Sequence, residues 1–245
     1  DVTNCEFVDS VEAACLYIGS SMLVSEISDC RFDTVIPALG SGGLGTIYSP
    51  FSLSYSIIKN CYFKHTSGSI PVGINFGNMK SSTIRGCHIM GILTAGISIA
   101  DFKDSFITDC FISPAVSGGG TGFIFTGGDF SSIKGCTIKN CGTGIESTIG
   151  YDVDSLTLSS NMIEGALNGI LLGRAAADDC SNVTFTGNTI VGTGAVASPV
   201  NYGIQAEYSA NLAVHGNTVD GFNRGYAING DNTEVALDMV VSGNK

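Results

Sequence analysis

Ten copies of one short pattern run through this chain of 245 residues, and they constrain its fold more than any other feature. In each copy an apolar residue, a polar residue and a bend residue precede Cys or Asn, and a variable residue and a second apolar residue follow. A repeat of this period is typical of a solenoid, in which each unit buries its apolar side chains against the next. The Cys or Asn positions, spaced 23 to 31 residues apart, are Cys5, Cys30, Cys61, Cys87, Cys110, Cys136, Asn161, Asn188, Asn217 and Asn244.

The residue before each Cys or Asn predicts a bend in the backbone. It is Asn, Asp or Gly in every copy except one, where it is Ser160. Asn, Asp and Gly adopt the left-handed conformation at the lowest steric cost. Two short strands are therefore expected to meet at this bend. The Cys or Asn and the apolar residue two positions later then point to the same side.

A third strand is indicated midway between the copies, where a glycine precedes an apolar or aromatic residue. Three strands per coil of about 25 residues predict an all-β fold, a right-handed parallel β-helix of about ten coils. Helical alternatives fail because Gly and Ser interrupt every window of helical periodicity. The glycines of this signature are Gly73, Gly96, Gly122, Gly144, Gly169, Gly203 and Gly225.

Stacked coils place equivalent residues in ladders, which explains the choice of Cys and Asn. Buried Asn side chains are expected to bond one another and the backbone of the bend, whereas Cys is small and easily buried. Near residue 150 the ladder changes from Cys to Asn. Five residues earlier in each coil, Ser changes to Leu, Val or Met at the same point. The coils continue through this change, so we interpret residues 1–245 as a single domain.

The chain opens and stops inside coils, which leaves strand edges and core positions unpaired at both ends. We therefore expect a fragment of a longer polypeptide that lacks its caps, or a chain capped by partner subunits.

The nine cysteines and the net charge limit which cofactors and partners the chain is expected to have. Six cysteines fall in one ladder with parallel Cβ vectors, so reduced thiols are expected. The spacing fits no CxxC metal pair, and we predict neither a metal nor a cofactor. A net charge of −11 argues against nucleic acid as a partner. No apolar run approaches 18 residues, so no membrane span is predicted.

The repeat resembles the right-handed parallel β-helix superfamily, typified by pectate lyases, polygalacturonases and bacteriophage tailspikes. The resemblance covers essentially the whole chain. Within the superfamily, the reduced cysteines and missing ends look most like a phage tailspike or tail-fibre body. That resemblance implies a homotrimer on the virion tail, made in the bacterial cytoplasm, that binds and often cleaves a surface polysaccharide of the host.

The catalytic motifs of two enzyme families in the superfamily are mostly missing. Polygalacturonases carry Asn-Thr-Asp, Asp-Asp, Gly-His-Gly and Arg-Ile-Lys motifs, of which only Asp178-Asp179 and His215-Gly216 are echoed here. Pectate lyases use an acidic calcium cluster and a catalytic Arg, and no three acidic residues lie in register with an Arg.

The variable position after each Cys or Asn is expected to face outward. There Tyr62, His88 and Phe111 occupy three consecutive coils. An exposed aromatic strip suits sugar rings, whose C–H faces pack on π-systems. The alternative is that a loop or a second subunit covers the strip.

A second outward face follows the glycine signature, and it carries Glu146 and Glu207 two coils apart. We estimate a backbone separation of roughly 12 Å from the strand geometry. Two carboxyl groups brought within the roughly 6.5–9.5 Å of an inverting glycosidase would supply its acid and its base. Glu146 and Glu207 are therefore the candidate catalytic residues, with Gln205 beside them. The alternative is a pair of solvated surface glutamates.

Two longer excursions flank the glutamates, and excursions from a rigid solenoid commonly build its binding surface. The segment 172–182 carries Arg174, Asp178 and Asp179, and the segment 192–202 ends in Tyr202. Arg174 and Gln205 are predicted to position the substrate. Tyr202 is predicted to contact the sugar, as the aromatic strip is, and Asp178 and Asp179 complete the candidate substrate-binding set.

The sequence thus predicts a tailspike-like receptor-binding protein that recognises and hydrolyses a bacterial capsule or O-antigen. One alternative is a non-catalytic stalk or adhesin, favoured by the apolar outward residues Ile124 and Leu171. Another is an extracellular polysaccharide lyase or epimerase.

Overall fold

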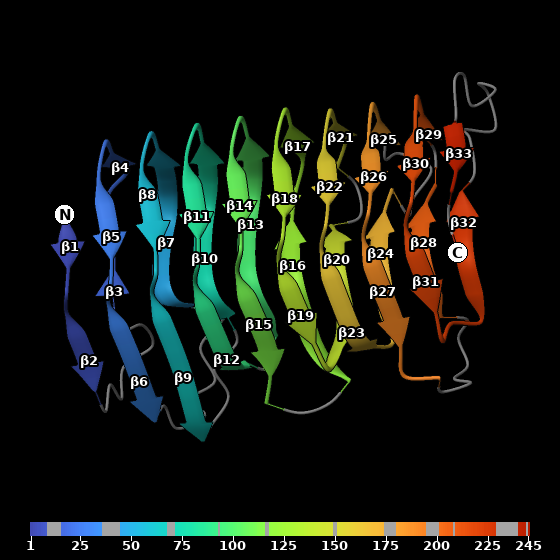
Figure 1. Cartoon of the computed structure of the whole chain (residues 1–245). Helices are drawn as coiled ribbons and strands as arrows, with labels where there is room; N and C mark the ends of the chain where they lie inside the picture. Colours follow the sequence, from blue (N-terminus) through green and yellow to red (C-terminus); the bar gives the residue numbers. More distant parts are fainter. Residues whose placement is uncertain are drawn as a thin grey trace.

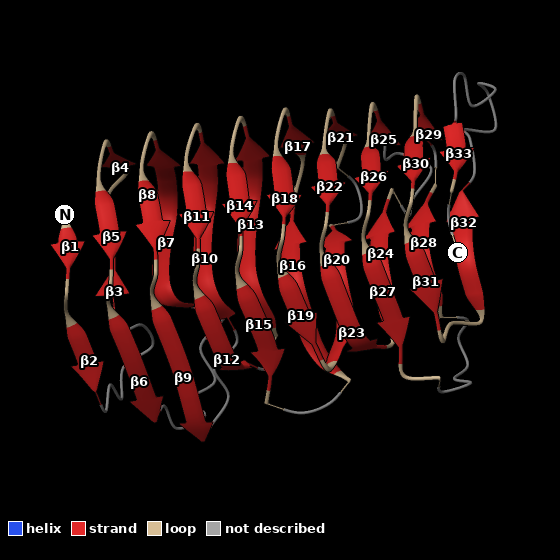
Figure 2. Cartoon of the chain, in the orientation of Figure 1, coloured by secondary structure: helices blue, strands red, loops and turns tan. Residues whose placement is uncertain are grey.

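The computed structural model describes residues 1–8, 16–35, 45–67, 72–92, 94–115, 118–148, 151–173, 180–194, 201–207, 209–228, 240–243 and 245. Within these ranges the regular secondary structure is all strand (Figure 2). The strands stack coil upon coil along one axis, in chain order from the N-terminal to the C-terminal end (Figure 1). None of the residues described forms a helix with the length and apolar character needed to cross a bilayer.

The described strands form three parallel sheets, named here A, B and C. Sheet A precedes the bend in each coil and comprises β1 (Val2–Thr3), β5 (Glu26–Ser28), β8 (Ile57–Lys59), β11 (Thr83–Arg85), β14 (Phe106–Thr108), β18 (Ser132–Lys134), β22 (Thr157–Ser159), β26 (Thr184–Thr186), β30 (Ala213–His215) and β33 (Val240–Ser242). Sheet B follows the bend and comprises β2 (Glu6–Val8), β6 (Arg31–Val35), β9 (Tyr62–Ser67), β12 (His88–Ile92), β15 (Phe111–Pro114), β19 (Thr137–Lys139), β23 (Met162–Ala166), β27 (Thr189–Gly192) and β31 (Thr218–Asp220).

Sheet C returns the chain to the start of the next coil. It comprises β3 (Leu16–Tyr17), β4 (Met22–Leu23), β7 (Gly45–Ser54), β10 (Val72–Lys80), β13 (Ala95–Lys103), β16 (Gly119–Phe125), β17 (Gly128–Asp129), β20 (Cys141–Ser147), β21 (Val153–Asp154), β24 (Asn168–Leu172), β25 (Cys180–Ser181), β28 (Tyr202–Ala206), β29 (Ser209–Ala210) and β32 (Arg224–Ile228). Its strand is continuous in three coils, as β7, β10 and β13, and is divided in two in five others, as in β16 and β17. The three stacked parallel sheets confirm the predicted parallel β-helix.

The bend between sheets A and B has the predicted left-handed backbone in all ten copies. Its φ angles lie between 52° and 66°, and Ser160, the one residue outside the Asn, Asp or Gly pattern, has a φ of 54°. The amide of the bend residue bonds to the next coil in the first nine copies, as from Asn60 to the carbonyl of Arg85 at 3.0 Å. The stacked neighbour therefore holds Ser160 in the same bend as the better-suited residues.

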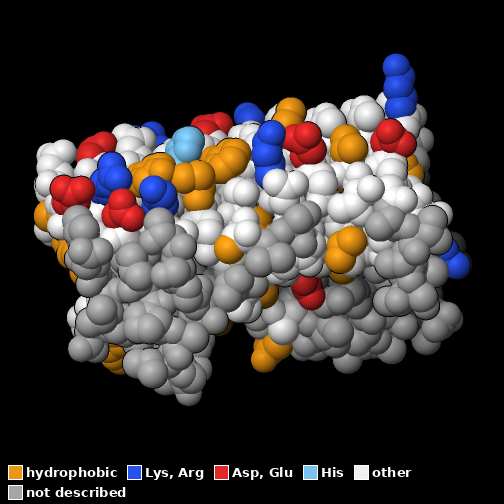
Figure 3. Space-filling model, turned by 90° about the horizontal axis from the view of Figure 1, so that it is seen from below, with side chains coloured by type: hydrophobic (Ala, Val, Ile, Leu, Met, Phe, Trp, Pro, Cys, Tyr) orange, Lys and Arg blue, Asp and Glu red, His pale blue; other side chains and the backbone are white. Residues whose placement is uncertain are grey.

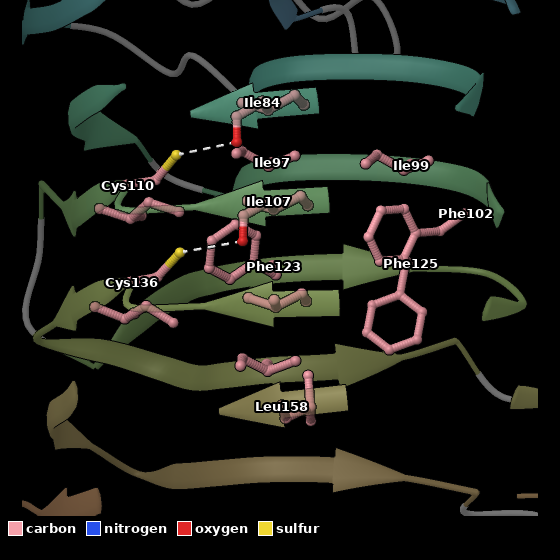
Figure 4. Packing of buried hydrophobic residues seen from close by; sticks show 14 of the residues in the cluster. Ile84, Ile97, Ile99, Phe102, Ile107, Cys110, Phe123, Phe125, Cys136 and Leu158 are labelled. Carbon is pink, nitrogen blue, oxygen red and sulfur yellow. Dashed lines mark hydrogen bonds between the residues drawn. The ribbon is translucent and has the colours of Figure 1, made fainter. Parts of the chain in front are cut away.

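The core is built from the apolar residues on both sides of the bend. Ile84, Ile107, Ile133 and Leu158 stack in register on the inner face of sheet A. The Cys ladder lies beside them, with Cys110 Sγ 4.0 Å from the carbonyl oxygen of Ile84 and Cys136 Sγ 3.9 Å from that of Ile107 (Figure 4). The cysteines that the structure describes are all free thiols, as predicted.

The Asn ladder satisfies its own buried amides, as expected. The side-chain oxygen of Asn188 accepts the backbone N–H and the side-chain N–H of Asn161, both at 3.0 Å. Asn217 repeats this arrangement with Asn188 at 2.9 Å. The remaining amide hydrogens reach backbone carbonyls of the preceding coil, such as that of Leu158. Each polar group removed from water thus has a partner.

A second left-handed corner lies between sheets C and A, and the sequence pattern did not predict it. Its residues have φ angles between 47° and 56° and are Val24, Tyr55, Ser81, Asp104, Phe130, Ser155, Asn182 and Asn211. The serine that follows this corner in the earlier coils forms a hydroxyl ladder. The hydroxyl of Ser82, for example, accepts the amide of Ser56 at 3.0 Å and bonds to the carbonyl of Lys80 at 2.8 Å.

The glycine signature marks the place where sheets B and C approach most closely. A Cβ built on Gly144 would lie 2.6 Å from the carbonyl oxygen of Gly169 and 2.7 Å from two methyl carbons of Ile163. The same clash recurs along the ladder, with Ile89, Ile112, Ile138 and Ile190 in place of Ile163. Glycine is therefore required because the inner residue of sheet B fills the space that a side chain would take.

Candidate functional site

The outward row of sheet B carries the predicted aromatic strip, which we define as Tyr62, His88 and Phe111. The three residues are direct register partners on β9, β12 and β15. Their rings stack, with centroids 6.5 Å apart for Tyr62 and His88 and 5.5 Å apart for His88 and Phe111. The strip follows from the alternation of strand side chains, because the residues on either side of each ring point into the core.

Charged groups border the strip at its N-terminal end. The Arg31 guanidinium lies 5.5 Å from the Tyr62 ring centroid and forms ion pairs with Asp33 at 2.9 Å and Glu6 at 3.6 Å. Its hydrogen bond to Asp33 raises the pKa of Arg31 above its usual value. Figure 3 shows this part of the surface, where a histidine lies among hydrophobic side chains with basic and acidic groups beside it. The strip is thus an apolar ridge with hydrogen-bonding groups at one end.

A second row of sheet B runs beside the strip, two residues further along each strand. Asp33, Lys64, Met90 and Ser113 are consecutive register partners in it. A chain lying on the stacked rings would meet one carboxylate, one ammonium group and one hydroxyl along this row. The combination suits a neutral or weakly charged sugar chain, whose rings have an apolar face and hydroxylated edges.

The two candidate catalytic glutamates lie on sheet C, a different face from the aromatic strip. Glu146 on β20, Leu171 on β24 and Gln205 on β28 are successive register partners, and Glu207 follows β28 two residues after Gln205. The Thr121 hydroxyl donates to Glu146 Oε2 at 3.5 Å. Register thus places Glu146 and Gln205 in one row, as predicted, with one residue between them.

That intervening residue is apolar and buried, although it is on the outer side of the sheet. Leu171 has only 5% of its surface exposed, while Ile170 and Leu172 beside it face the core. Gln205 is also buried. This stretch of sheet C is therefore a covered surface between the two glutamates, unlike the open strip on sheet B.

The remaining predicted substrate contacts have separate surroundings. Tyr202 begins β28, and the Arg224 guanidinium of the next coil lies 5.8 Å from its ring centroid. One face of the Tyr202 ring is therefore already occupied by a cation. Arg174, Asp178 and Asp179 lie outside the described residues.

Asp154, another acidic residue near Glu146 in sequence, has a structural role. Its Oδ1 atom accepts hydrogen bonds from Asn182 at 2.8 Å, Ser181 at 3.1 Å and Ser155 at 3.2 Å. These bonds, that from Asn182 foremost, lower the pKa of Asp154. The carboxylate links two coils at the second left-handed corner.

The described residues contain no cluster of three or more His, Cys, Asp or Glu suited to a metal ion.

Sequence reasoning missed one feature of the surface, a depression on the outer face of sheet A. It has a volume of about 440 Å³ and is lined by residues that include Phe106, Phe130 and Lys134. Alternation along the sheet A strands, applied as it was to sheet B, would have predicted that Phe106 and Lys134 face outward. The outward position of Phe130 could not be predicted in this way, because the corner on which it lies was not predicted.

Two solved structures resemble this chain at 13% sequence identity. No curated protein matches the sequence. The solved structure of the Streptococcus pneumoniae surface protein and adhesin PfbA is similar, with 13% identity and a TM-score of 0.49 over 87% of this chain. This chain spans 64% of the length of that one. The A-module of the Azotobacter vinelandii mannuronan C-5 epimerase AlgE6 is 13% identical, with a TM-score of 0.29 over 92% of this chain and 78% of its own.

The family comparison covers the chain from end to end. The profile of the right handed beta helix region matches residues 1–145 and 72–245. Together with the three stacked parallel sheets, this match shows that the chain belongs to the right-handed β-helix family.

Proposed function

We propose that this protein binds a bacterial surface polysaccharide along the outer face of sheet B, as a phage tailspike-like receptor-binding protein does. The observation that carries the proposal is the stack of Tyr62, His88 and Phe111, whose centroids are 6.5 Å and 5.5 Å apart on three consecutive coils. The stacked rings form a continuous apolar ridge along three coils, against which the C–H groups of successive sugar residues can pack. Arg31, Asp33 and Lys64 at the edge supply groups for the sugar hydroxyls.

Several features of the strip favour a sugar chain over a protein partner. The rings belong to rigid strands whose neighbours are buried, so little conformational entropy is lost on binding. His88 is exposed and Tyr62 and Phe111 are half-buried, so the stacked rings present their edges to solvent along the row. A protein interface would favour a broader apolar patch than one row of rings. The geometry therefore fits a linear ligand laid parallel to the solenoid axis.

Hydrolysis is the second part of the proposal, with Glu146 and Glu207 as acid and base and Gln205, Tyr202, Arg174, Asp178 and Asp179 as contacts. Its support is the register that places Glu146 and Gln205 in one outer row and Glu207 two residues beyond. Since the glutamates are on sheet C, binding at the aromatic strip and cleavage would be separate functions of two faces. A homotrimer, as in tailspikes, would bring different faces of neighbouring subunits together.

The rival function is a non-catalytic stalk or adhesin. One specific observation favours it: the outer-row residue Leu171 between the two glutamates is buried. The chain itself covers this residue, so the row between the glutamates is not an open groove for a substrate. Under this rival the aromatic strip would still be free to bind a glycan, but no cleavage would occur.

The experiment that tests the proposal measures binding and cleavage together. The intact protein is incubated with purified bacterial capsules and O-antigens, and retained polysaccharide and released reducing ends are quantified. Binding with release of defined oligosaccharides is the expected result. Binding alone would assign the adhesin, and calcium-dependent unsaturated products or epimerised sugars would assign the lyase or epimerase. No interaction with any polysaccharide would contradict the proposal.

A further inference from the structure

The depression on the outer face of sheet A spans three consecutive coils. Phe106, Ser132 and Thr157 are register partners on β14, β18 and β22, which lie side by side in Figure 1. Phe130 stands at the corner that leads into β18, and Lys134 ends that strand. The volume of about 440 Å³ is in the range of sites that hold one or two sugar-sized groups.

Phe130 is placed at a conformational cost. Its φ is 50°, a left-handed value that disfavours a bulky side chain. In five other coils a Ser, Asp or Asn occupies this corner, and these polar residue types suit it better, whereas Val24 and Tyr55 share it with Phe130 in the first two coils that the structure describes there. The Phe130 ring is 64% exposed, so core packing does not compensate for the strain. The stacking of the coils imposes this corner, and what distinguishes Phe130 is that its exposed ring lines the depression.

A second exposed ring faces the same depression. Phe106 on β14 is 51% exposed and lies on the outer row of sheet A. Its register partners Thr83 and Ser132 have short polar side chains, so the Phe106 ring projects beyond them from the surface of sheet A. Two exposed aromatic side chains lining one depression can hold the apolar face of a ring between them.

The other end of the depression is positively charged. Lys134 is exposed and, among the described residues, its ammonium group has no carboxylate within ion-pair distance, unlike Lys59, Lys103 and Lys139. Lys59 and Arg85 occupy the same outer row in earlier coils. The row is basic although the chain has a net charge of −11. Corner carboxylates lie at both ends of the neighbouring strand, Asp104 at the Phe106 end and Asp109 beside Gly135, so Lys134 is the cation among the residues that line the depression itself.

Hydroxyl groups complete the lining. Ser132, Thr157 and Ser159 each offer a hydroxyl that both donates and accepts hydrogen bonds. None of these groups forms a hydrogen bond to another described side chain. A ligand with its own hydroxyl groups is therefore matched along the depression.

We propose that the depression is a binding site for a carboxylated sugar residue, such as a uronic acid within an acidic oligosaccharide. Phe106 and Phe130 pack on the ring, Lys134 pairs with the carboxylate, and Ser132 and Thr157 bond the ring hydroxyls. The site is on a different sheet from the aromatic strip and shares no residue with it. It therefore stands whether or not the strip binds a polysaccharide.

The key variant is Phe130→Asn, because Asn suits the left-handed corner and removes only the ring. Binding is measured by calorimetry against a panel of uronate-containing hexasaccharides and their carboxyl-reduced counterparts. We expect wild type to prefer an acidic member to its reduced form by at least tenfold. Phe130→Asn is expected to weaken that binding at least tenfold, with an unfolding temperature equal to or above wild type. Tyr55→Asn, the same change at the same corner three coils earlier, is the matched control and is expected to bind as wild type does.

Lys134→Met tests the charge separately. It is expected to abolish the preference for the acidic hexasaccharide while Lys134→Arg retains it. Binding by Phe130→Asn equal to that of wild type, or a preference that survives in Lys134→Met, would overturn the proposal. So would failure of every acidic hexasaccharide to bind. The protein could instead self-associate through the depression. Self-association that competes with the sugar and is abolished by Phe130→Asn would overturn the proposal and assign the depression to a second copy of the chain. A loss of acidic-hexasaccharide binding in Tyr62→Ala, with binding retained in Phe130→Asn, would assign that binding to the aromatic strip and overturn the proposal.

Discussion

The side-chain oxygen of Asn188 accepts two hydrogen bonds from Asn161, one from its backbone amide and one from its side-chain amide, each at 3.0 Å. One buried atom thus satisfies two donors of the neighbouring coil. The Asn ladder therefore links coils through side chains as well as through the strands, and it fixes which residue of one coil lies above which residue of the next.

Asn188→Ala tests this link. The substitution leaves the two donors of Asn161 and the carbonyl of Leu158 without partners in a buried site. Because each such group costs about 1–3 kcal/mol, a loss of about 3 kcal/mol or more in the free energy of unfolding is expected. Urea denaturation measures it. The control Thr186→Ala removes an exposed side chain two residues earlier, and an equal loss in both variants would contradict the role of the ladder.

The glycine ladder makes a prediction that distinguishes two alanine substitutions. Gly144→Ala places a Cβ 2.6 Å from the Gly169 carbonyl oxygen, and overpacking of this kind costs about 1–3 kcal/mol. At Gly225 the nearest atom, on Val219, is 3.9 Å away. Gly225→Ala is therefore expected to be neutral or slightly stabilising. Thermal unfolding of the two variants checks the difference, and similar unfolding temperatures would show that the sheets are less closely packed than described.

The buried thiols predict a loss of stability at alkaline pH. Burial raises the pKa of Cys141 from 9.0 to about 12. In the unfolded chain the thiol loses its proton above about pH 9, whereas in the folded protein it keeps the proton until about pH 12. The stabilisation is therefore complete below pH 9 and is lost as the pH rises toward 12, by about 1.4 kcal/mol per pH unit. Cys141→Ala is expected to flatten the pH dependence of unfolding above pH 9, and an unchanged slope would contradict this account.

The glutamate pair is tested by the double substitution Glu146→Gln and Glu207→Gln. If these residues are the acid and base, release of reducing ends from a cleaved polysaccharide should fall at least a thousandfold while binding at the aromatic strip is retained. Glu164→Gln is the matched control, because Glu164 is an exposed glutamate of sheet B that pairs with Lys139. Cleavage by the double variant at the wild-type rate would remove both residues from the mechanism.

Much of the architecture could be predicted because its constraints are local. The bend needs a left-handed residue, so Asn, Asp and Gly mark it in the sequence. Alternation then fixes which neighbours face inward. The second corner was missed because Val24, Tyr55 and Phe130 adopt the left-handed conformation there although their residue types do not indicate it. Their strain is imposed by stacking on neighbouring coils, which no single coil reveals.

The glycine signature predicted a strand from the sequence, but the reason why glycine is required there is seen only in the three-dimensional structure. Gly144 and Ile163 are brought together by the approach of sheets B and C, and no local rule gives that distance. The candidate sites divide in the same way. Register predicted the neighbours of His88, since they follow from one position of the repeat. The burial of Leu171 between the candidate glutamates depends on what covers sheet C, and periodicity contains no such information.

The measurement that tests the central claim most directly is the affinity of the aromatic-strip variant for a bacterial surface polysaccharide that the wild type retains. Tyr62→Ala combined with Phe111→Ala removes two of the three stacked rings and leaves the Cys ladder and core unchanged. Burying a large apolar side chain contributes about 1.5–3 kcal/mol, so the loss of two rings from the contact is expected to lower the affinity at least tenfold. Tyr17→Ala, which removes a 59% exposed ring on sheet C, is expected to bind as wild type does. Equal affinity of the wild type and the double variant would contradict polysaccharide recognition by sheet B.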